Sequence, residues 1–309
     1  MIRPAAWPAV VLAAGLGTRL RPLSAVRAKA ALPVAGRPIV IRILEQLKAA
    51  GVERVVVNLH HRAETIARVV GDGRQLGLDV RYSWESEVLG SGGGPARALP
   101  LLAADRFFIV NGDTLAQVDL AALAAAHHAS GALATLAVVP ANLASYNAIL
   151  ADASGQWTGV AARGTPAADV RGTPWHFVGL QAVNAAAFAS VDASRPSETV
   201  REIYPGLVAE RPGAVRVFPT TGSFFDVGTP ADYFATVRLV AEAEHRPLDR
   251  GADVFIHPTA RVEDCILWDR VTVGAQARLT RCIVADDVQI PAGVRYDRMV
   301  ITRDAVVSV

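Results

Sequence analysis

The stretch VVLAAGLGTRLRPL (residues 10–23) joins a short apolar run to a glycine-rich loop that carries cations. An apolar run of this length, followed at once by glycine, is typical of a buried parallel strand and the loop at its carboxyl end. Gly15 and Gly17 allow the backbone to approach a ligand closely, and Arg19 adds a fixed positive charge beside them. Ligands of open α/β sheets bind beyond the carboxyl ends of the strands. The stretch therefore predicts a ligand-binding loop at the end of the first strand.

Strand-like and helix-like segments alternate after this stretch, which predicts an α/β domain with a mixed, mostly parallel sheet and helices on both faces. The strand-like segments are 9–15, 54–60, 78–84, 106–113, 132–140, 214–218 and 223–230. The helix-like segments are 38–50, 62–70, 93–103, 119–129 and 230–244. A polar segment over residues 242–253 follows, so the first domain is predicted over residues 1–245.

The last part of the chain is an internal repeat with a period of seventeen residues. Written in rows that begin at Ile256, Val273 and Ile290, it places small or aliphatic residues in shared columns at roughly six-residue steps. This pattern is typical of a hexapeptide β-helix, in which neighbouring coils bury each other's faces. A short β-helix is therefore predicted over residues 253–309. Cys265 and Cys282 share one column, which predicts stacked interior thiols rather than reactive ones.

Composition excludes several classes of protein. The 309 residues are 51% hydrophobic and carry a formal net charge of +2, without a basic run or a basic-aromatic motif, so no nucleic-acid partner is expected. Apolar runs are interrupted before membrane-spanning length, so no membrane partner is expected. The apolar run near the N-terminus is interpreted as the first strand rather than a signal peptide. Two cysteines do not make a disulfide framework and favour a cytoplasmic location.

The glycine loop continues into a long segment, residues 17–40, that is rich in cations and carries three prolines. A dinucleotide fingerprint needs a third glycine where Leu20 stands, and a Walker loop needs Gly-Lys-Ser/Thr where Thr18 and Arg19 stand. Backbone amides combined with fixed cations suit a polyphosphate, and long ordered loops of this kind are usually functional. The cations that we expect over the strand ends are Arg19, Arg21, Arg27 and Lys29.

Two aspartates supply the opposite charge. Asp113 ends the strand-like segment FFIVNGD, and Asp226 stands in a similar setting in FFDVGTP. Mg²⁺ prefers one or two carboxylates together with phosphate oxygens and water. The pattern therefore predicts a Mg²⁺ site beside the phosphates.

The motif order LAAGLGTRLRPL…AKAALPV, VLGSGGGPARALPLL, VNGDTL, FVGLQAVN and FFDVGTPADY resembles the sugar-1-phosphate nucleotidylyltransferases (EC 2.7.7.-) over nearly the whole chain. The layout is most similar to the mannose-1-phosphate guanylyltransferase branch, which ends in a left-handed β-helix. The resemblance implies a Rossmann-like nucleotidyltransferase domain. It also implies Mg²⁺-dependent transfer of a nucleoside monophosphate from an NTP to a sugar 1-phosphate, with release of pyrophosphate.

The same resemblance implies the roles of individual residues. Arg19, Lys29 and Asp113 are the expected catalytic residues, and Asp113 and Asp226 the expected Mg²⁺ ligands. The expected nucleotide-binding residues are Leu12, Ala14, Gly15, Gly17, Thr18, Glu85, Gly90, Ser91, Gly92 and Gly93. The expected sugar-binding residues are Asn147, Arg163 and Gly179. The Glu-Lys-Pro motif that contacts sugar and phosphate in many relatives is replaced here by the segment 159–169, in which Arg163 is the cation available.

The segment LGSGGGPARAL (residues 89–99) corresponds to the part of these enzymes that meets the base, and its glycines suit close approach to a planar ring. The carboxylate of Glu85 accepts two hydrogen bonds, which fits the N–H edge of guanine. GTP and mannose 1-phosphate are therefore the favoured substrates, and GDP-mannose the favoured product. The segment also resembles bacterial N-acetylmuramate-1-phosphate uridylyltransferase. Uridylyl or thymidylyl transfer to glucose, N-acetyl-sugar or heptose 1-phosphate is the alternative.

Two further alternatives come from other classes of protein. The missing Glu-Lys-Pro motif favours a catalytically silent subunit that senses nucleotide sugars. The charged residues expected at the phosphate and metal positions are present, which argues against it: Arg19, Lys29, Asp113 and Asp226. Hexapeptide β-helices often build acyltransferase sites, but three coils offer little groove. A homo-oligomer formed through the β-helix or the catalytic domain is expected. The pairs His60–His61 and His127–His128 lack metal-ligand spacing and are interpreted as helix-edge or surface residues.

Overall fold

The computed structural model describes residues 7–309 and divides into two compact units. The first unit contains the chain up to Gly15 together with Ile43–His60 and Val70–Phe224, and the second contains Leu16–Arg42, His61–Val69 and Phe225–Val309. This division differs from the domain boundary expected at residues 245–253. The long cationic loop and the helix at 230–243 group with the C-terminal repeats. Residues 1–6 of the first expected domain lie outside the described part.

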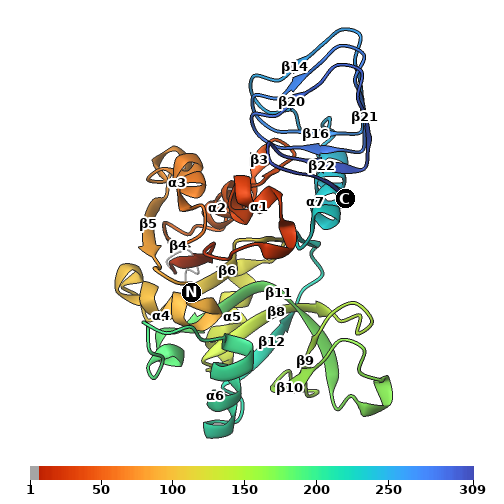
Figure 1. The fold of residues 1–309 in the computed structure, drawn as a ribbon. Helices are drawn as coiled ribbons and strands as arrows, with labels where there is room; N and C mark the ends of the chain where they lie inside the picture. The colour runs from red at the N-terminus through yellow and green to blue at the C-terminus, as the bar shows by residue number, and fades with distance from the viewer. Residues whose placement is uncertain (1–6) are drawn as a thin grey trace. The chain divides into compact units, whose positions relative to one another are not determined.

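A nine-stranded mixed sheet forms the first unit (Figure 1), as predicted. Its order is β10-β9-β11-β6-β1-β4-β5, and β8 pairs with both β11 and β12. The neighbours β6, β1, β4 and β5 run parallel, whereas β11 is antiparallel to β6. The strands are β1 (Ala9–Leu12), β4 (Arg54–Leu59), β5 (Asp79–Trp84), β6 (Arg106–Asn111), β8 (Ala134–Pro140), β9 (Ala148–Ala151), β10 (Trp157–Ala161), β11 (Thr173–Asn184) and β12 (Val215–Pro219).

Helices cover both faces of this sheet. Alternate residues of a strand point to opposite faces, so the apolar side chains of β6 are packed on both sides. Phe107 and Ile109 of β6 join the core cluster that also contains Ala98 and Leu102 of α4. Phe108 points the other way, with its ring 5.4 Å from the ring of Trp7. The remaining elements of the unit are α4 (Gly90–Leu102), α5 (Leu120–Ser130), α6 (Tyr204–Glu210), β7 (Thr114–Ala116), η4 (Arg74–Leu76), η5 (Ala167–Asp169), η6 (Ala185–Phe188) and η7 (Thr199–Ile203).

His127 of α5 corrects the expectation of a surface histidine. Its side chain is 1% exposed, its ring lies edge-on to Trp7 at 5.8 Å, and its Nδ1 is 2.9 Å from Oγ1 of Thr135. Burial lowers the pKa of this imidazole. The residue thus packs in the core on the Phe108 side of the sheet, because its polar atoms find partners there and its ring finds an aromatic neighbour.

The second unit begins with the cationic loop and includes short helices and a small hairpin. Its elements before the repeats are η2 (Thr18–Leu20), α1 (Leu23–Val26), η3 (Lys29–Ala31), β2 (Pro33–Val34), β3 (Arg37–Pro38), α3 (Ala63–Val70) and α7 (Pro230–Ala243). The helix α2 (Ile39–Ala49) begins in this unit and continues into the first, and β13 (Phe224–Asp226) spans the other junction. Tyr233 of α7 donates from its hydroxyl to the carbonyl oxygen of Pro33 at 2.7 Å, so the hairpin is fixed to the helix.

The seventeen-residue repeats fold into a three-sided parallel β-helix (Figure 1), as predicted. Ile256, Val273 and Ile290 pair in one side, and Ile266, Ile283 and Val300 in another, so the predicted columns are the observed register. The sides are β14 (Phe255–Ile256), β17 (Thr272–Val273) and β20 (Gln289–Ile290); β15 (Arg261–Glu263), β18 (Arg278–Thr280) and β21 (Arg295–Asp297); and β16 (Ile266–Leu267), β19 (Ile283–Val284) and β22 (Met299–Ile301), extended by the antiparallel β23 (Val306–Ser308).

Cys265 and Cys282 are both buried in the core of the β-helix, as predicted. Their thiols repeat one geometry a coil apart, since Sγ of Cys265 donates to the carbonyl of Glu263 and Sγ of Cys282 to that of Thr280. The amide of Cys282 also donates to Sγ of Cys265 at 3.3 Å. Both side chains therefore serve as small interior groups with local hydrogen-bond partners.

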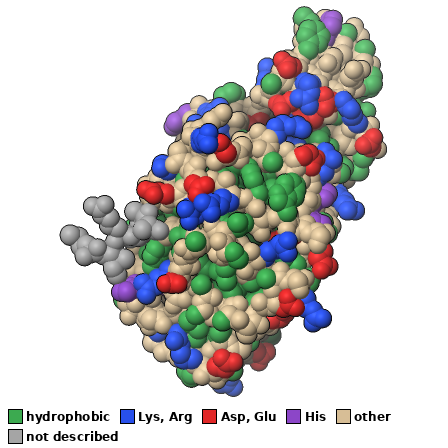
Figure 2. Space-filling model, turned by 90° about the vertical axis from the view of Figure 1, so that its left-hand side faces the viewer, with side chains coloured by type: hydrophobic (Ala, Val, Ile, Leu, Met, Phe, Trp, Pro, Cys, Tyr) green, Lys and Arg blue, Asp and Glu red, His purple; other side chains and the backbone are tan. Residues whose placement is uncertain are grey.

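The surface carries charges of both signs. On the face drawn in Figure 2, Lys and Arg side chains are interspersed with Asp and Glu. Within residues 7–309, no helix combines the length and the apolar character needed to cross a bilayer.

Candidate functional site

The loop after Gly15 is held in shape by contacts within the second unit. Gly17 has φ +58°, in the left-handed region that favours glycine, and begins the short helix η2. Oγ of Ser24 donates to the carbonyl oxygen of Gly17 at 2.8 Å. A Cβ at Gly17 would stand 3.1 Å from that of Ser24, so the turn has little room for a side chain. Thr18 and Arg19 follow the turn with exposed side chains.

Lys29 and Asp226 meet in this unit. Nζ of Lys29 lies 3.8 Å from Oδ1 of Asp226, and the two side chains are 12% and 38% exposed. Lys29 opens η3, whose next residues Ala30 and Ala31 are buried. The buried alanines fix the backbone of the turn. The Lys29 ammonium group therefore lies in a defined place beside a carboxylate that solvent can still reach.

Arg19 lies against the segment Asp226–Thr229, which also contains the partner of Lys29. A Cβ at Gly228 would stand 3.3 Å from Nη1 of Arg19, so the guanidinium lies close over this glycine. Thr229 then caps α7 by accepting from the amide of Asp232 at 3.2 Å. The segment Asp226–Thr229 thus places one carboxylate and one glycine beside the two predicted phosphate-binding cations. This arrangement brings together Arg19, Lys29 and Asp226, three of the residues predicted from the sequence.

Arg27 does not serve as a fourth phosphate-facing cation. Its Nε donates to Oδ2 of Asp286 at 2.7 Å, and its Nη2 lies 2.6 Å from Oδ2 of Asp269. Both aspartates belong to the β-helix, so the guanidinium faces the repeats instead of a ligand. The sequence did not show this, because 259 residues separate Arg27 from Asp286.

In the first unit, Asn58 anchors the beginning of the same loop and was not among the predicted site residues. Its Oδ1 accepts from the amides of Ala13 and Ala14 at 2.6 and 3.2 Å. The side chain is 2% exposed at the end of β4. One asparagine within the apolar run RVVVNL was the available signal, since a polar group in a buried strand needs partners. Asn58 fixes the backbone at which the expected nucleotide-binding residues Ala14 and Gly15 lie, and a Cβ at Gly15 would meet no atom within 4 Å.

Glu85 continues this network. Its Oε1 accepts from Nδ2 of Asn58 at 2.7 Å, and its Oε2 accepts from the amide of Leu89 at 2.9 Å. The residue is 5% exposed. Each oxygen of the carboxylate therefore binds the protein's own chain, and the side chain holds the Asn58 amide against the start of α4. This placement differs from the expectation of a carboxylate open to the edge of a base, because burial and two internal donors engage it.

The glycines at the start of α4 are required by packing. A Cβ at Gly92 would stand 2.5 Å from Cδ1 of Ile203, and one at Gly93 would stand 2.5 Å from the carbonyl oxygen of Arg195. Both glycines are buried, so they give α4 close contact with residues 195–203 rather than a surface for a planar ring. Gly90, with φ +74°, begins the helix and remains partly exposed.

Ser91 of α4 is held by its own chain. Its Oγ donates to Oε2 of Glu198 at 2.7 Å and accepts from the amide of Thr199 at 2.9 Å. The hydroxyl that we expected to serve a nucleotide thus fastens α4 to η7. Glu198 and Thr199 were not among the predicted residues, and no sequence pattern links them to Ser91.

The strand ends of β1 and β6 meet at Gly112. The amide of Gly112 donates to the carbonyl oxygen of Leu12 at 2.8 Å, and a Cβ there would clash with that oxygen at 2.6 Å. The partly exposed Asp113 follows, and Oγ1 of Thr114 donates to its Oδ1 at 3.2 Å. Leu12 and Asp113 therefore lie at the carboxyl end of the parallel strands, where a ligand of such a sheet binds.

The two predicted Mg²⁺ ligands fit the donor chemistry of that ion. Asp113 follows β6 in the first unit and Asp226 ends β13 in the second, and both carboxylates are partly exposed. Mg²⁺ keeps several waters and takes one or two carboxylates along with phosphate oxygens. Within residues 7–309, no group of three or more His, Cys, Asp or Glu side chains is arranged to hold a metal.

The predicted sugar-binding residues lie around β9–β11. Oδ1 of Asn147 accepts from the amide of Arg163 at 2.8 Å, which brings these two residues together. Gly179 lies against Asn111 at the end of β6, where a Cβ would stand 3.0 Å from the Asn111 side chain. Gly179 therefore borders the strand that leads to Asp113.

A cavity of about 320 Å³ lies beside Asn147. Its walls include the apolar side chains of Ile149, Phe177 and Val200, with His176 and Arg201 as the groups that can carry charge. Burial lowers the pKa of His176. Arg201, which the sequence did not single out, is thus the cationic group of this cavity, and η7 positions it.

Two parts of the chain match models of known protein families. Residues 8–156 match the family model described as nucleotidyl transferase, and residues 250–299 match a GlmU-like C-terminal hexapeptide model. The chain therefore contains a nucleotidyl transferase domain followed by a GlmU-like hexapeptide domain. The fold prediction of a nucleotidyltransferase domain followed by a left-handed β-helix is confirmed, and so is the prediction of an enzyme of this class.

Relatives of this nucleotidyl transferase include mannose-1-phosphate guanylyltransferase of Mycobacterium tuberculosis, 29% identical over 82% of this chain and 71% of the relative. N-acetylmuramate alpha-1-phosphate uridylyltransferase of Neisseria meningitidis is 42% identical over 37% of this chain and 50% of that protein. HddC from Yersinia pseudotuberculosis, whose crystal structure covers 76% of this chain and 99% of its own, has a TM-score of 0.65 at 23% identity. That likeness supports the fold alone.

Proposed function

We propose that this enzyme transfers a nucleoside monophosphate from an NTP to a sugar 1-phosphate and releases pyrophosphate, with GTP and mannose 1-phosphate as the preferred pair. The observation that carries the proposal is the pairing of Lys29 with Asp226, together with the position of Arg19 over Gly228, two residues after Asp226. The relatives that match over most of the chain are named as mannose-1-phosphate guanylyltransferases, which supports the choice of substrates.

The reaction needs positioning and charge neutralisation. An oxygen of the sugar phosphate attacks the α-phosphorus, a new P–O bond forms, and the α–β bridging oxygen leaves with the bonding electron pair as part of pyrophosphate. The attacking oxygen is already anionic near neutral pH, so no general base is required. We assign Arg19 to the β- and γ-phosphates and Lys29 to the α-phosphate and the sugar phosphate. Fixed cations at these places stabilise the charge that develops in the transition state.

Mg²⁺, held by Asp113 and Asp226, would neutralise phosphate charge when bound. The nucleotide would lie along Leu12, Ala14, Gly15, Gly17 and Thr18 with its base toward Gly90, and the sugar would lie toward Asn147, Arg163 and Gly179. Four of the expected nucleotide-binding residues contact the protein's own chain and would support this site without touching the nucleotide: Glu85, Ser91, Gly92 and Gly93.

The preference for guanine rests on the relatives and not on Glu85, whose carboxylate is engaged by Asn58 and Leu89. One observation favours a second candidate. The likeness to the N-acetylmuramate alpha-1-phosphate uridylyltransferase reaches 42% identity over 115 residues, so transfer of UMP to an N-acetyl sugar is the alternative substrate pair.

We further propose that the enzyme acts in the cytoplasm as a homo-oligomer. Two free, buried cysteines suit a reducing compartment. Exposed apolar side chains gather on the last strand of the β-helix, where Val306 and Val307 are 45% and 39% exposed. An exposed strand with apolar side chains is a favourable surface for self-association. Sedimentation of the wild type and of a Val306→Lys, Val307→Lys variant measures this, and a monomeric wild type would refute it.

The proposed activity is tested by pyrophosphate release with Mg²⁺, crossing GTP, UTP, dTTP, ATP and CTP with mannose, glucose, N-acetylglucosamine, N-acetylmuramate and heptose 1-phosphates. A clear preference for GTP and mannose 1-phosphate supports the proposal, and a preference for UTP and an N-acetyl sugar supports the alternative. If no pair reacts while a nucleotide sugar raises the melting temperature, the protein is instead a sensor of nucleotide sugars.

A further inference from the structure

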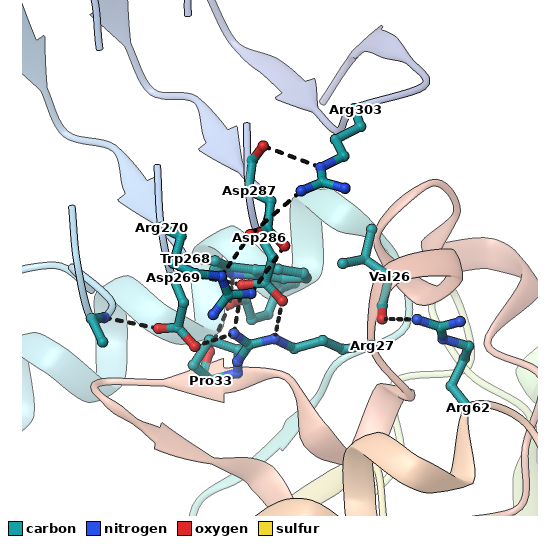
Figure 3. A network of polar contacts seen from close by, with 12 residues as sticks. Val26, Arg27, Pro33, Arg62, Trp268, Asp269, Arg270, Asp286, Asp287 and Arg303 are labelled. Carbon is teal, nitrogen blue, oxygen red and sulfur yellow. Dashed lines mark hydrogen bonds and ion pairs between the residues drawn. The ribbon is translucent and has the colours of Figure 1, made fainter. Parts of the chain in front are cut away.

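The β-helix presents two aspartates of the same register position to one guanidinium (Figure 3). Asp269 and Asp286 occupy equivalent places in adjacent coils, seventeen residues apart. Like charges that are held close together repel each other. Arg27 offsets this repulsion, since its Nε and Nη2 bind Asp286 at 2.7 and 2.6 Å and its Nη2 also binds Asp269 at 2.6 Å.

The two carboxylates are fixed by the backbone of the β-helix. Oδ1 of Asp286 accepts from the amide of Asp269 at 3.0 Å, and Oδ1 of Asp269 accepts from the amide of Ala252 at 2.8 Å. The guanidinium also lies over the ring of Trp268, with Cζ 5.1 Å from the ring centroid. Trp268 is itself held, because its Nε1 donates to the hydroxyl of Tyr233 at 3.0 Å. Asp269, Asp286 and Trp268, which bind Arg27, are therefore each held in place by hydrogen bonds of their own.

The backbone on each side of Arg27 is also anchored. Nη2 of Arg62 donates to the carbonyl oxygen of Val26 at 2.9 Å (Figure 3). The amide of Ala28 donates to Oγ1 of Thr65 at 3.0 Å. The Arg27 side chain is 15% exposed in its pair with Asp286. Burial lowers the pKa of Arg27, but the two aspartates outweigh it and raise the pKa above its ordinary value. The guanidinium is thus a permanent cation in a largely buried contact.

Lys29 stands two residues after this anchor, at the start of η3. Arg19 stands at the other end of the same segment, over Gly228. We propose that Arg27 is a positioning residue for nucleotidyl transfer, which fixes the segment that carries Arg19 and Lys29 to the first two coils of the β-helix. The β-helix thereby acts as part of the phosphate-binding apparatus in addition to any role in assembly. This inference rests on the proposed function, because it takes Arg19 and Lys29 as the phosphate-binding cations.

The first arm of the test compares Arg27→Ala with Arg270→Ala. Arg270 pairs with Asp287 at 2.6 Å on the same coils, so the control removes an equal charge and a bidentate ion pair that is more exposed than that of Arg27. A misplacement of about 1 Å can cost about 100-fold in rate, so we expect kcat to fall about 100-fold in Arg27→Ala at saturating NTP. We expect Arg270→Ala to stay near wild type. Arg27→Lys keeps the charge without the bidentate contact and should fall between them. Equal kcat values for both alanine variants would overturn the inference.

The second arm uses the paired aspartates. The Asp269→Asn, Asp286→Asn variant should lose about as much kcat as Arg27→Ala, and adding Arg27→Ala to it should change little, because residues that act as one unit are not additive. Full additivity would count against the inference.

The third arm does not depend on activity. Hydrogen exchange of the amides in residues 16–31 should quicken in Arg27→Ala and not in Arg270→Ala, while the β-helix core stays protected in both. If the wild type transfers no nucleotide but this exchange pattern appears, the proposed function fails and the anchoring of the loop stands. Unchanged exchange in Arg27→Ala would refute the anchoring itself.

Discussion

The ammonium nitrogen of Lys29 lies 3.8 Å from Oδ1 of Asp226. This contact joins a loop near the start of the chain to a strand near the end of the first predicted domain. It places a cation that suits phosphate beside a carboxylate that suits Mg²⁺. When an NTP with its metal binds, the phosphates can pair with Lys29 and the metal with Asp226. The protein therefore holds both groups in position before the substrate arrives, which lowers the cost of reorganisation.

Replacing Lys29 with methionine should reduce kcat by about 10²–10³, the usual cost of removing a group that stabilises transition-state charge. The melting temperature should change little, since a partly exposed ion pair contributes little stability. Pyrophosphate release and thermal melting measure the two effects. Lys48→Met is the matched control, because Lys48 is the second lysine of the chain and is exposed at the end of α2. Wild-type turnover in Lys29→Met would remove Lys29 from the site.

Replacing Asp226 with asparagine should raise the Mg²⁺ concentration for half-maximal activity by at least about tenfold, because a neutral amide is a poorer ligand for this ion than a carboxylate. Titration of activity against Mg²⁺ measures the change. Asp72→Asn is the control, since Asp72 is 61% exposed and pairs with Arg74. Identical Mg²⁺ titrations for Asp226→Asn and wild type would contradict the assignment of Asp226 as a metal ligand.

Replacing Asn58 with aspartate should lower the free energy of unfolding by about 3 kcal/mol or more, because it turns a buried donor into a carboxylate that faces Glu85. Glu85→Gln should restore much of this loss in the double variant, since glutamine can donate where Asn58 did and still accept from Leu89. Urea unfolding measures all three proteins. If Glu85→Gln alone shifts the nucleotide preference and does not alter stability, Glu85 contacts the base, and its assignment as a structural residue is wrong.

The buried His127 makes stability depend on pH. Its pKa is lowered by burial from the ordinary 6.5, so below that value the unfolded state binds the proton more readily than the folded state. Stability should therefore fall as the pH drops from 7 to 5.5. His127→Gln should flatten this dependence of the melting temperature, and His128→Gln, at the exposed neighbour, should not. An unchanged slope in His127→Gln would show that other groups cause the dependence.

Much of the fold could be predicted from the sequence because its signals are local. The apolar run of β1, the alternation of strands and helices, and the seventeen-residue columns of the β-helix each reflect a short-range pattern. Observed helix ends lie within about three residues of those expected, as for α4, which begins at Gly90 instead of residue 93. The glycine that opens the helix adopts φ +74°, which the pattern of apolar residues does not reveal.

The candidate site was predicted only in part, because side-chain partners depend on long-range contacts. Lys29 pairs with Asp226, and Arg19 lies over Gly228, two residues after Asp226, and each of the three stands in a motif that the sequence shows. Arg27 was expected beside the phosphates and instead binds the β-helix, and Glu85 binds Asn58 instead of presenting its carboxylate to a base. Composition and spacing do not distinguish an arginine that faces a ligand from one that faces a carboxylate brought close by folding.

The most direct test of nucleotidyl transfer follows the α- and γ-phosphates of GTP separately. The enzyme is incubated with Mg²⁺, mannose 1-phosphate and GTP labelled with ³²P at either the α or the γ position, and the products are separated. The α label should enter a nucleotide sugar while the γ label appears in pyrophosphate, because the bond between the α- and β-phosphates is broken. Release of the γ label as inorganic phosphate, with no α label in a nucleotide sugar, would contradict it.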